Sequence, residues 1–154
     1  MPYEELLKRR RLKEYEARPQ EVKRLLQVAA RDLATAERVL PDELDWAYTI
    51  AYNAMLQAGR ALMFYKGYRP RGKDQHRTVV RFCELTLGPG YRQQLALFDQ
   101  MRRKRHRLIY EAIGLVSRQE AEQALAFAKD FVEEIRLLIT GQPKLELPEE
   151  PKKE

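Results

Sequence analysis

The sequence predicts an all-α fold: an antiparallel bundle of four main helices, with a short additional helix and an N-terminal helix. In four segments, apolar residues recur at three- and four-residue steps, which places them on one face of a helix. No segment alternates apolar and polar residues over the length that a strand would need. The connections are mostly short, as they are between neighbouring helices of a bundle.

Length and composition favour a single domain, because a chain of 154 residues, of which 44% are hydrophobic, can bury one core. We expect an N-terminal helix or arm over residues 1–18 and the bundle over residues 19–140. Residues 141–154 have few apolar side chains and are rich in proline and charge, so we expect a disordered tail there.

The charge balance favours an anionic partner, because 29 Lys and Arg against 23 Asp and Glu give a net charge of +6. Cys83 is the only cysteine, so it cannot form an internal disulfide, and neither histidine stands at zinc-ligand spacing. No stretch resembles a membrane span or the apolar core of a signal peptide. We therefore expect a cytoplasmic protein that makes no membrane contact.

The first three elements follow from the apolar positions and the helix breakers. Residues 3–17 are mostly charged with a thin apolar stripe, and they predict an outer helix or an interaction arm. Pro19 suits a first helical turn and begins an amphipathic helix that runs to about Leu40. The next helix, from Asp42 as N-cap to about Lys66, is apolar around most of its circumference. We expect it at the centre of the bundle.

The second half of the chain begins with a basic loop after Gly67, a natural helix C-cap. Basic residues beside an aromatic residue suit phosphate contact and base stacking. The candidate RNA-binding residues of this loop are Arg69, Arg71, Lys73 and His76. A short helix over residues 78–87 is then expected, followed by a helix from about residue 91 to Val116. Ser117 suits the N-cap of a last helix that Gly141 ends.

The most unusual stretch lies over residues 98–116, where an arginine falls among apolar positions. The apolar residues of this helix face are Leu95, Phe98, Met101, Ile109, Ala112 and Val116. Arg105 lies in the middle of the face, and a charged side chain is buried only where a carboxylate or other acceptors receive it. Asp32 is one candidate carboxylate, and Asn53 or Gln57 could also face this arginine.

Arg102, His106 and Tyr110 follow one another at four-residue steps along the edge of that face. Arginine holds a phosphate with its planar guanidinium and histidine moves protons near neutral pH, so the group suits a phosphodiester. The sequence has no glycine-rich phosphate loop, metal-ligand spacing or activated nucleophile, so we expect no metal and no cofactor. In a purely structural alternative, Arg105 bridges buried carboxylates and the other basic residues form a solvated face.

The segment RRKRHRLIYE, from Arg102 to Glu111, resembles the signature of HEPN domains, in which an arginine and a polar residue precede three further residues and a histidine. The segment AYNAMLQAGRALMFYKGYRPRG, over residues 51–72, and the histidine-containing short helix after it resemble a HEPN branch whose arginine-rich motif ends in tyrosine. Together the resemblances cover about residues 20–140. They imply a helical bundle that dimerises with its motif helices facing each other.

By this resemblance, Arg105 takes the place of the motif arginine, His106 that of the polar residue and Tyr110 that of the histidine of active nucleases. Tyrosine ordinarily has a pKa near 10 and is a poor general base at neutral pH. The candidate catalytic residues are Arg102, Arg105, His106 and Tyr110, and Arg103 and Arg107 are further candidate RNA contacts.

The resemblance implies a homodimer that binds RNA or a nucleotide. It also implies a metal-independent endoribonuclease of a toxin–antitoxin or defence system, paired with a nucleotidyltransferase antitoxin. The alternative is a non-catalytic helical interaction module that docks a partner protein such as a nucleotidyltransferase. Salt-dependent RNA binding favours the first function, because phosphate contacts release counterions.

Overall fold

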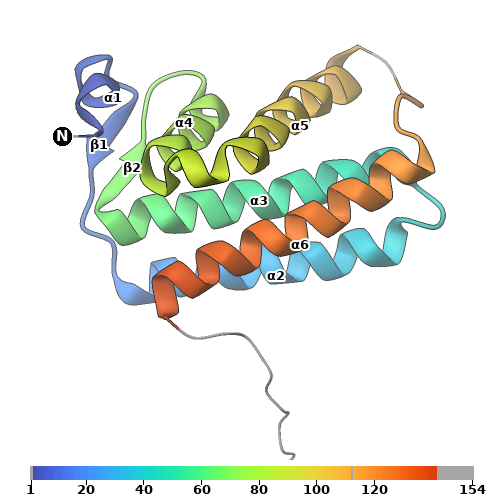
Figure 1. Cartoon of the computed structure of the whole chain (residues 1–154), viewed down its shortest axis with the longest axis horizontal. Helices are drawn as coiled ribbons and strands as arrows, with labels where there is room; N and C mark the ends of the chain where they lie inside the picture. Colours follow the sequence, from blue (N-terminus) through green and yellow to red (C-terminus); the bar gives the residue numbers. More distant parts are fainter. Residues whose placement is uncertain (1, 112, 142–154) are drawn as a thin grey trace, which may run out of the picture.

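The computed structural model describes residues 2–111 and 113–141, and it confirms the predicted all-α fold (Figure 1). The elements are α1 (Glu4–Lys8), β1 (Leu12–Glu14), α2 (Pro19–Val39), α3 (Leu44–Lys66), β2 (Tyr68–Pro70), α4 (Gln75–Leu87), the 3₁₀ helix η1 (Pro89–Tyr91), α5 (Arg92–Tyr110) and α6 (Arg118–Thr140). Ala112 and the expected tail, apart from Gly141, lie outside the described residues.

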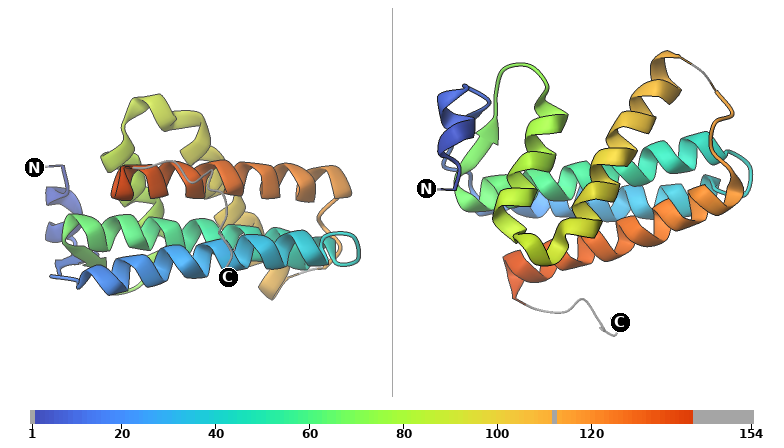
Figure 2. Two further views of the ribbon diagram at one scale, coloured as in Figure 1. Left: turned by 90° about the horizontal axis from the view of Figure 1, so that it is seen from below. Right: turned by 45° about the horizontal axis from the view of Figure 1, so that its top comes forward.

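Helix α3 is central, as its apolar circumference predicts, because α2, α4, α5 and α6 all pack against it. Helix α2 runs antiparallel to both α3 and α6, so α3 and α6 run in the same direction (Figure 1). Helices α4 and α5 form a V on one side of this layer, joined through η1 (Figure 2). The open end of the V holds the N-terminal end of α4 and the C-terminal end of α5.

The approach of α4 to α3 depends on Gly59. A Cβ atom at this position would lie 2.6 Å from Val79 Cγ1 and 3.2 Å from Cys83 Sγ. Real Cβ atoms do not come as close as 2.6 Å to another heavy atom, so only glycine allows the two helices to pack at this separation.

The N-terminal segment differs from the single helix expected over residues 3–17. Helix α1 ends at Lys8, and β1 then pairs antiparallel with β2, with Leu12 opposite Pro70. The reason is burial: Leu12 is 1% exposed, and Tyr3 stacks on Phe82 with 4.3 Å between the ring centroids. A continuous helix could not bring both side chains onto the bundle, so the chain turns between them.

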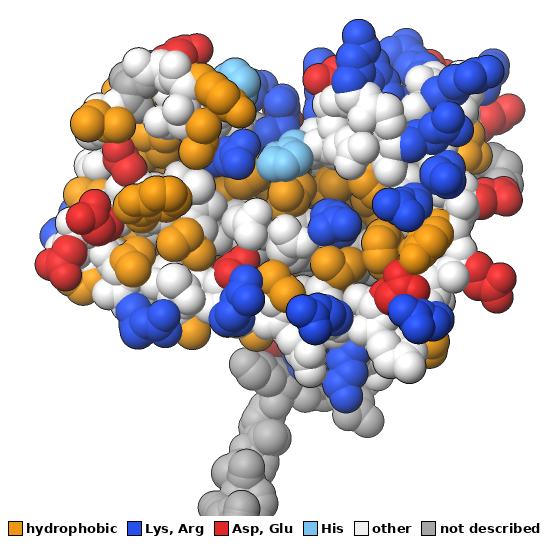
Figure 3. Space-filling model, turned by 180° about the vertical axis from the view of Figure 1, so that it is seen from behind, with side chains coloured by type: hydrophobic (Ala, Val, Ile, Leu, Met, Phe, Trp, Pro, Cys, Tyr) orange, Lys and Arg blue, Asp and Glu red, His pale blue; other side chains and the backbone are white. Residues whose placement is uncertain are grey.

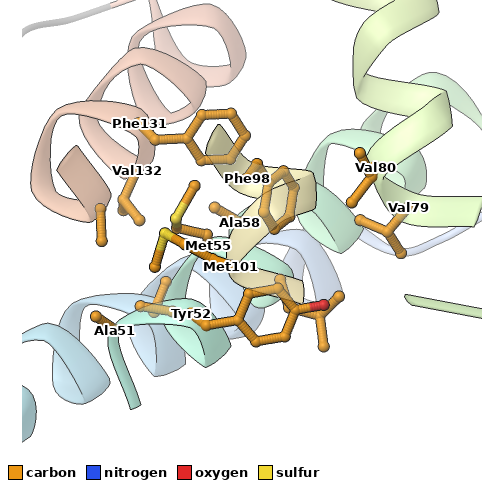
Figure 4. Packing of buried hydrophobic residues seen from close by; sticks show 14 of the residues in the cluster. Ala51, Tyr52, Met55, Ala58, Val79, Val80, Phe98, Met101, Phe131 and Val132 are labelled. Atoms are coloured by element: carbon orange, nitrogen blue, oxygen red, sulfur yellow. The ribbon is translucent and has the colours of Figure 1, made fainter. Parts of the chain in front are cut away.

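Helix α5 is fixed to the core by its first half. The ring of Phe98 lies 5.7 Å from that of Tyr52 and 5.1 Å from that of Phe131, with Met55 and Met101 beside them (Figure 4). This packing sets which face of α5 turns outward.

The second half of α5 departs from the predicted helix. The helix ends at Tyr110 rather than near Val116, and Leu108, not Ile109, is buried there. Val116 is buried, but in the connection that follows the helix. Ile109 is 45% exposed because Leu108 occupies the core-facing side of this last turn.

Of the four residues expected to cap helices, three are confirmed. Gly67 and Gly141 adopt left-handed conformations after α3 and α6, and Ser117 Oγ accepts a hydrogen bond from Glu120 N. Glu43, not Asp42, is the N-cap of α3. No helix within the described residues is long and apolar enough to cross a membrane.

Candidate functional site

A pocket of about 220 Å³ lies between the start of α4 and the second half of α5. Its lining residues are Asp74, Gln75, His76, Arg77, Arg102, Arg105, His106 and Tyr110. Figure 3 shows this hollow between two lobes of the surface, with both histidines and several Lys and Arg side chains beside it. The four candidate catalytic residues therefore line one pocket, which also contains His76.

Helix α5 forms one wall of the pocket, and the helical period decides which of its side chains line it. Because Phe98 and Met101 point into the core, Arg102 and Arg105 fall at its border, where both are half-buried. His106 and Tyr110 are one further step around the helix and are exposed, with 4.7 Å between their ring centroids. The helix thus presents arginines at the base of the pocket and aromatic rings at its rim.

The opposite wall is the first turn of α4. Asp74 precedes this helix in a left-handed conformation, and Gln75, His76 and Arg77 follow it. The Nδ1 atom of His76 lies 3.1 Å from the hydroxyl oxygen of Tyr52, which is fully buried on α3. This hydrogen bond holds the imidazole ring between the core and the pocket.

The electrostatics keep His76 neutral. Burial lowers the pKa of His76 below its ordinary value, and the positive charges of Arg105, Arg102 and Arg60 lower it further. Burial also raises the pKa of Tyr52, so its hydroxyl stays protonated. A neutral imidazole in this position can act as a general base.

Arg105 has no carboxylate partner among the described residues, contrary to the expectation from the sequence. Within the described residues it forms no ion pair, and it is half-buried rather than buried. Asp32 instead accepts a hydrogen bond of 2.8 Å from Asn53 and pairs with Arg31. The charge of Arg105 is therefore directed to the pocket and not neutralised inside the core.

Arg102 differs from Arg105 because it has a partner on its own helix. Its Nε donates to Asp99 Oδ1 at 2.8 Å, and both side chains are about three-quarters buried. This pair orients the guanidinium at the edge of the pocket.

Five of the candidate RNA contacts lie outside the pocket lining. Arg69 covers the ring of Tyr15, and Arg71 and Lys73 are exposed in the loop before α4. Arg103 and Arg107 are exposed on α5, where they pair with Asp99 at 3.0 Å and Glu111 at 3.8 Å. Of the predicted RNA contacts, only His76 joins the candidate catalytic residues.

Four residues at the site, Tyr52, Asp74, Gln75 and Arg77, are not among the candidates expected from the sequence. The last three belong to it because α4 begins at Gln75 rather than at Thr78, which places one more helical turn beside α5. The available signal is Asp74 itself, a residue type that favours positions just before a helix. Tyr52 carried no signal, because its partner is 24 residues away in the chain.

No group of His, Cys, Asp or Glu side chains in the described part of the chain could hold a metal ion. The pocket instead offers guanidinium groups, imidazoles and a phenol. This set can bind an anion and transfer protons.

A family model matches most of the chain. Residues 22–138 match the model described as the HEPN domain. The matched range contains α3, α4 and α5, and so both walls of the pocket, and begins after α1 and β1. No curated protein and no solved structure matches the chain.

Proposed function

Because the chain belongs to the HEPN domain family, whose members are associated with ribonuclease and nucleotide-binding roles, we propose that its pocket binds and cleaves RNA without a metal ion. The observation that carries this proposal is the convergence of Arg102, Arg105, His76 and His106 on one pocket. Such a nuclease would serve a toxin–antitoxin or defence system, and a nucleotide-containing ligand other than RNA would use the same anion site.

Arg105 is the residue proposed to hold the scissile phosphate. Its guanidinium makes no ion pair with the described residues, so it can give a fork of N–H donors to two phosphate oxygens. The same donors stabilise the extra negative charge that develops on phosphorus during cleavage. Arg102, oriented by Asp99, supports the phosphate from one helical turn away.

The proposed reaction is an internal displacement in the RNA. Neutral His76 removes the proton from the 2′-hydroxyl, O2′ bonds to phosphorus, and the bond from phosphorus to O5′ breaks as His106 donates a proton to O5′. The products are a 2′,3′-cyclic phosphate and a 5′-hydroxyl. The lowered pKa of His76 would keep this base active at somewhat lower pH than an ordinary histidine.

Tyr110 has a different proposed role. Its side chain is 70% exposed at the rim, next to the ring of His106. An exposed aromatic ring suits stacking against an unpaired base. We therefore assign Tyr110 to RNA binding and not to proton transfer.

The test is cleavage of a structured RNA in EDTA by the wild-type chain and by four folded variants. These variants are Arg105→Gln, His76→Asn, His106→Asn and Tyr110→Phe, with Arg92→Gln at the far end of α5 as the control. Loss of a general acid or base should reduce the rate roughly 100- to 10,000-fold. Tyr110→Phe keeps a ring that can stack, and it should retain most of the activity.

The possible results separate the roles. Cleavage that persists in EDTA and is lost in His76→Asn supports the proposed base, provided that circular dichroism shows a folded variant. Cleavage that is lost only in Tyr110→Phe would refute the assignment of His76. If every sample left the RNA intact but still bound it, the protein would be an RNA-binding protein, and the proposed ribonuclease activity would be refuted.

A homodimer is also part of the proposed function. Among the described residues, Trp46, Ile109 and Ile113 are large, exposed apolar side chains that line one pocket of about 340 Å³. Ile109 directly precedes Tyr110 in the last turn of α5, so this apolar surface lies at the same end of the helix as the rim of the RNA pocket. We propose that a second copy of the chain covers it, which would place the two RNA pockets near each other.

The second candidate function is a non-catalytic interaction module, and the same apolar surface favours it. In this case a partner protein such as a nucleotidyltransferase antitoxin covers Trp46, Ile109 and Ile113. RNA affinity no greater than that of another protein with this charge, together with loss of folding in Arg105→Ala, would favour the module. A steep salt dependence of RNA binding would favour the nuclease.

A further inference from the structure

We propose that a second pocket is a phosphate-binding site for the RNA strand. The strand would reach it on leaving the pocket of Arg105 and His76, which we call the cleavage pocket. This inference rests on the proposed function. The second pocket, the arginine groove, has a volume of about 430 Å³. Its lining residues are Glu5, Leu6, Arg9, Arg11, Asp74, Arg77, Thr78 and Arg81.

The arginine groove and the cleavage pocket adjoin each other at two shared lining residues. Arg77 and Asp74, at the start of α4, line both of them. Arg81 lies one turn further along α4, and Arg9 and Arg11 come from the N-terminal segment. A strand that passes Arg77 on its way out of the cleavage pocket therefore enters the groove.

The wall formed by the N-terminal segment is held in place by packing. Tyr3 stacks on Phe82 and its hydroxyl lies 2.6 Å from Thr86 Oγ1, both on α4. Arg11 donates from its side chain to Lys73 O at 2.8 Å. The position of the groove's arginines relative to α4 is therefore part of the fold.

The bend that carries Arg9 and Arg11 has an unusual backbone. Arg10, between them, has a φ of 58° in the left-handed region that non-glycine residues rarely adopt. It faces Gly72, where a Cβ atom would lie only 3.0 Å from Arg10 O. Backbone of this kind persists where the surrounding structure determines it, and here it directs two arginine side chains to one pocket.

The charge of the groove is suited to an anion. Its ionised lining consists of four arginines and two carboxylates, an excess of two positive charges. Arg9 pairs with Glu5, and Arg81 with Glu84, but these pairs are largely exposed and therefore weak. The side chain of Arg77 makes no ion pair or hydrogen bond within the described residues. A phosphate can replace the weak pairs and bind Arg77 directly.

The ligand that fits both pockets is a single strand of RNA with successive phosphates. A mononucleotide would fill only one of two adjoining anion sites. Proteins that bind single-stranded nucleic acid without sequence preference use a positively charged groove that follows the phosphate backbone of the strand. Figure 3 shows Lys and Arg side chains gathered over the upper right lobe of the surface, on the side of α1 and α4.

The N-terminal segment lies before residue 22, where the match to the HEPN model begins. The arginine groove therefore combines the family domain with a segment outside it. This origin separates the groove from the cleavage pocket, which lies wholly within the matched range.

The test measures binding by fluorescence anisotropy with 2′-O-methyl RNA, which lacks the nucleophile and remains intact. A single strand of about 12 nucleotides is compared with a trinucleotide. The variant is Arg9→Gln with Arg81→Gln. The control, Arg24→Gln with Arg38→Gln, removes the same charge from exposed positions on α2, which packs on α3 and α6.

We expect the groove variant to bind the longer RNA about tenfold more weakly than the wild type, while the control binds it as the wild type does. The slope of log affinity against log salt should fall by about 1.4, since two phosphate contacts are lost. Affinity for the trinucleotide should be the same in all three proteins.

Equal affinity of the groove variant and the control for the longer RNA would overturn the groove while leaving the proposed function intact. The same conclusion would follow if the wild type bound the trinucleotide as tightly as the longer strand. If the wild type bound neither RNA, the proposed function would fail, and the groove with it.

Discussion

His76 links the core to the cleavage pocket through one hydrogen bond, between its Nδ1 atom and the buried hydroxyl of Tyr52. Its imidazole ring also lies near the charges of Arg105 and Arg102, which oppose its protonation. The folded state therefore disfavours protonation of the residue proposed as the general base. Protonation of His76 should lower the stability of the fold as well as remove the base.

The first prediction concerns stability below neutral pH. The folded protein lowers the pKa of His76, so between the unfolded and the folded pKa the unfolded chain binds more protons. The contribution of His76 is fully present above about pH 6.5, the ordinary pKa of histidine, and is lost as the pH falls below it. Denaturant unfolding of the wild type and His76→Asn across this range should show a smaller pH dependence in the variant.

His106→Asn is the control, because it removes a histidine from the exposed rim of the same pocket. If His76→Asn retains the full pH dependence of the wild type, the buried environment of His76 is not its source.

The second prediction concerns Asp74, the acidic residue where the cleavage pocket and the arginine groove meet. Its carboxylate repels a passing phosphate, so Asp74→Asn should bind single-stranded RNA more tightly, with a gain of several-fold. Asparagine also adopts the left-handed conformation of Asp74, whose φ is 59°, so the start of α4 should be preserved. Anisotropy titrations check this, and weaker binding would show that the carboxylate instead organises the site through Arg11.

At the scale of the elements, the cleavage pocket depends on the separation between α3 and α4. Gly59 sets that separation, and the hydrogen bond from Tyr52 to His76 crosses the same interface. A small displacement of α4 would therefore move one wall of the pocket while leaving the other, on α5, in place.

The third prediction is that Gly59→Ala destabilises the fold by about 1–3 kcal/mol. Alanine favours a helix by roughly 1 kcal/mol over glycine, but its Cβ would meet the stiff side chain of Val79 at 2.6 Å. Chemical denaturation measures the loss. Gly90→Ala is the control, since no atom lies within 4 Å of a Cβ there, and equal stability of the two variants would contradict the proposed packing role.

At the scale of the whole molecule, the open end of the V carries two kinds of surface. The cleavage pocket and the arginine groove are basic, whereas the exposed side chains of Trp46, Ile109 and Ile113, at and after the last turn of α5, are apolar. The first suits a polyanion and the second suits another protein surface.

The fourth prediction is that Ile113→Lys converts a dimer into a monomer without unfolding the chain. Ile113 is 85% exposed, so the lysine would meet water in the monomer but would be buried at the proposed interface. Sedimentation velocity measures the change. Leu138→Lys, at an exposed apolar position on α6, should leave the dimer intact. A monomeric wild type would refute the homodimer and would favour a different partner protein on the apolar surface.

Much of the pocket was predictable because Arg102, Arg105, His106 and Tyr110 lie within a little over two turns of one helix. Their relative positions depend on the helical period alone. His76 was a candidate RNA contact for a separate reason, the basic loop around it. Its position opposite Arg105 depends on how α4 packs on α3, and no local sequence pattern predicts this packing.

By itself the sequence determined the four main helices, three of the four proposed capping residues and the central place of α3. These depend on residues within a turn or two of one another: Gly67 and Gly141 after helices, Ser117 before one, and apolar positions at the helical period. The tertiary structure alone decided that Arg105 forms no ion pair within the described residues, that Tyr52 meets His76, and that β1 pairs with β2. Each of these contacts, or its absence, depends on the packing of elements distant in the chain, where burial of side chains such as Leu12 outweighs local helix preference.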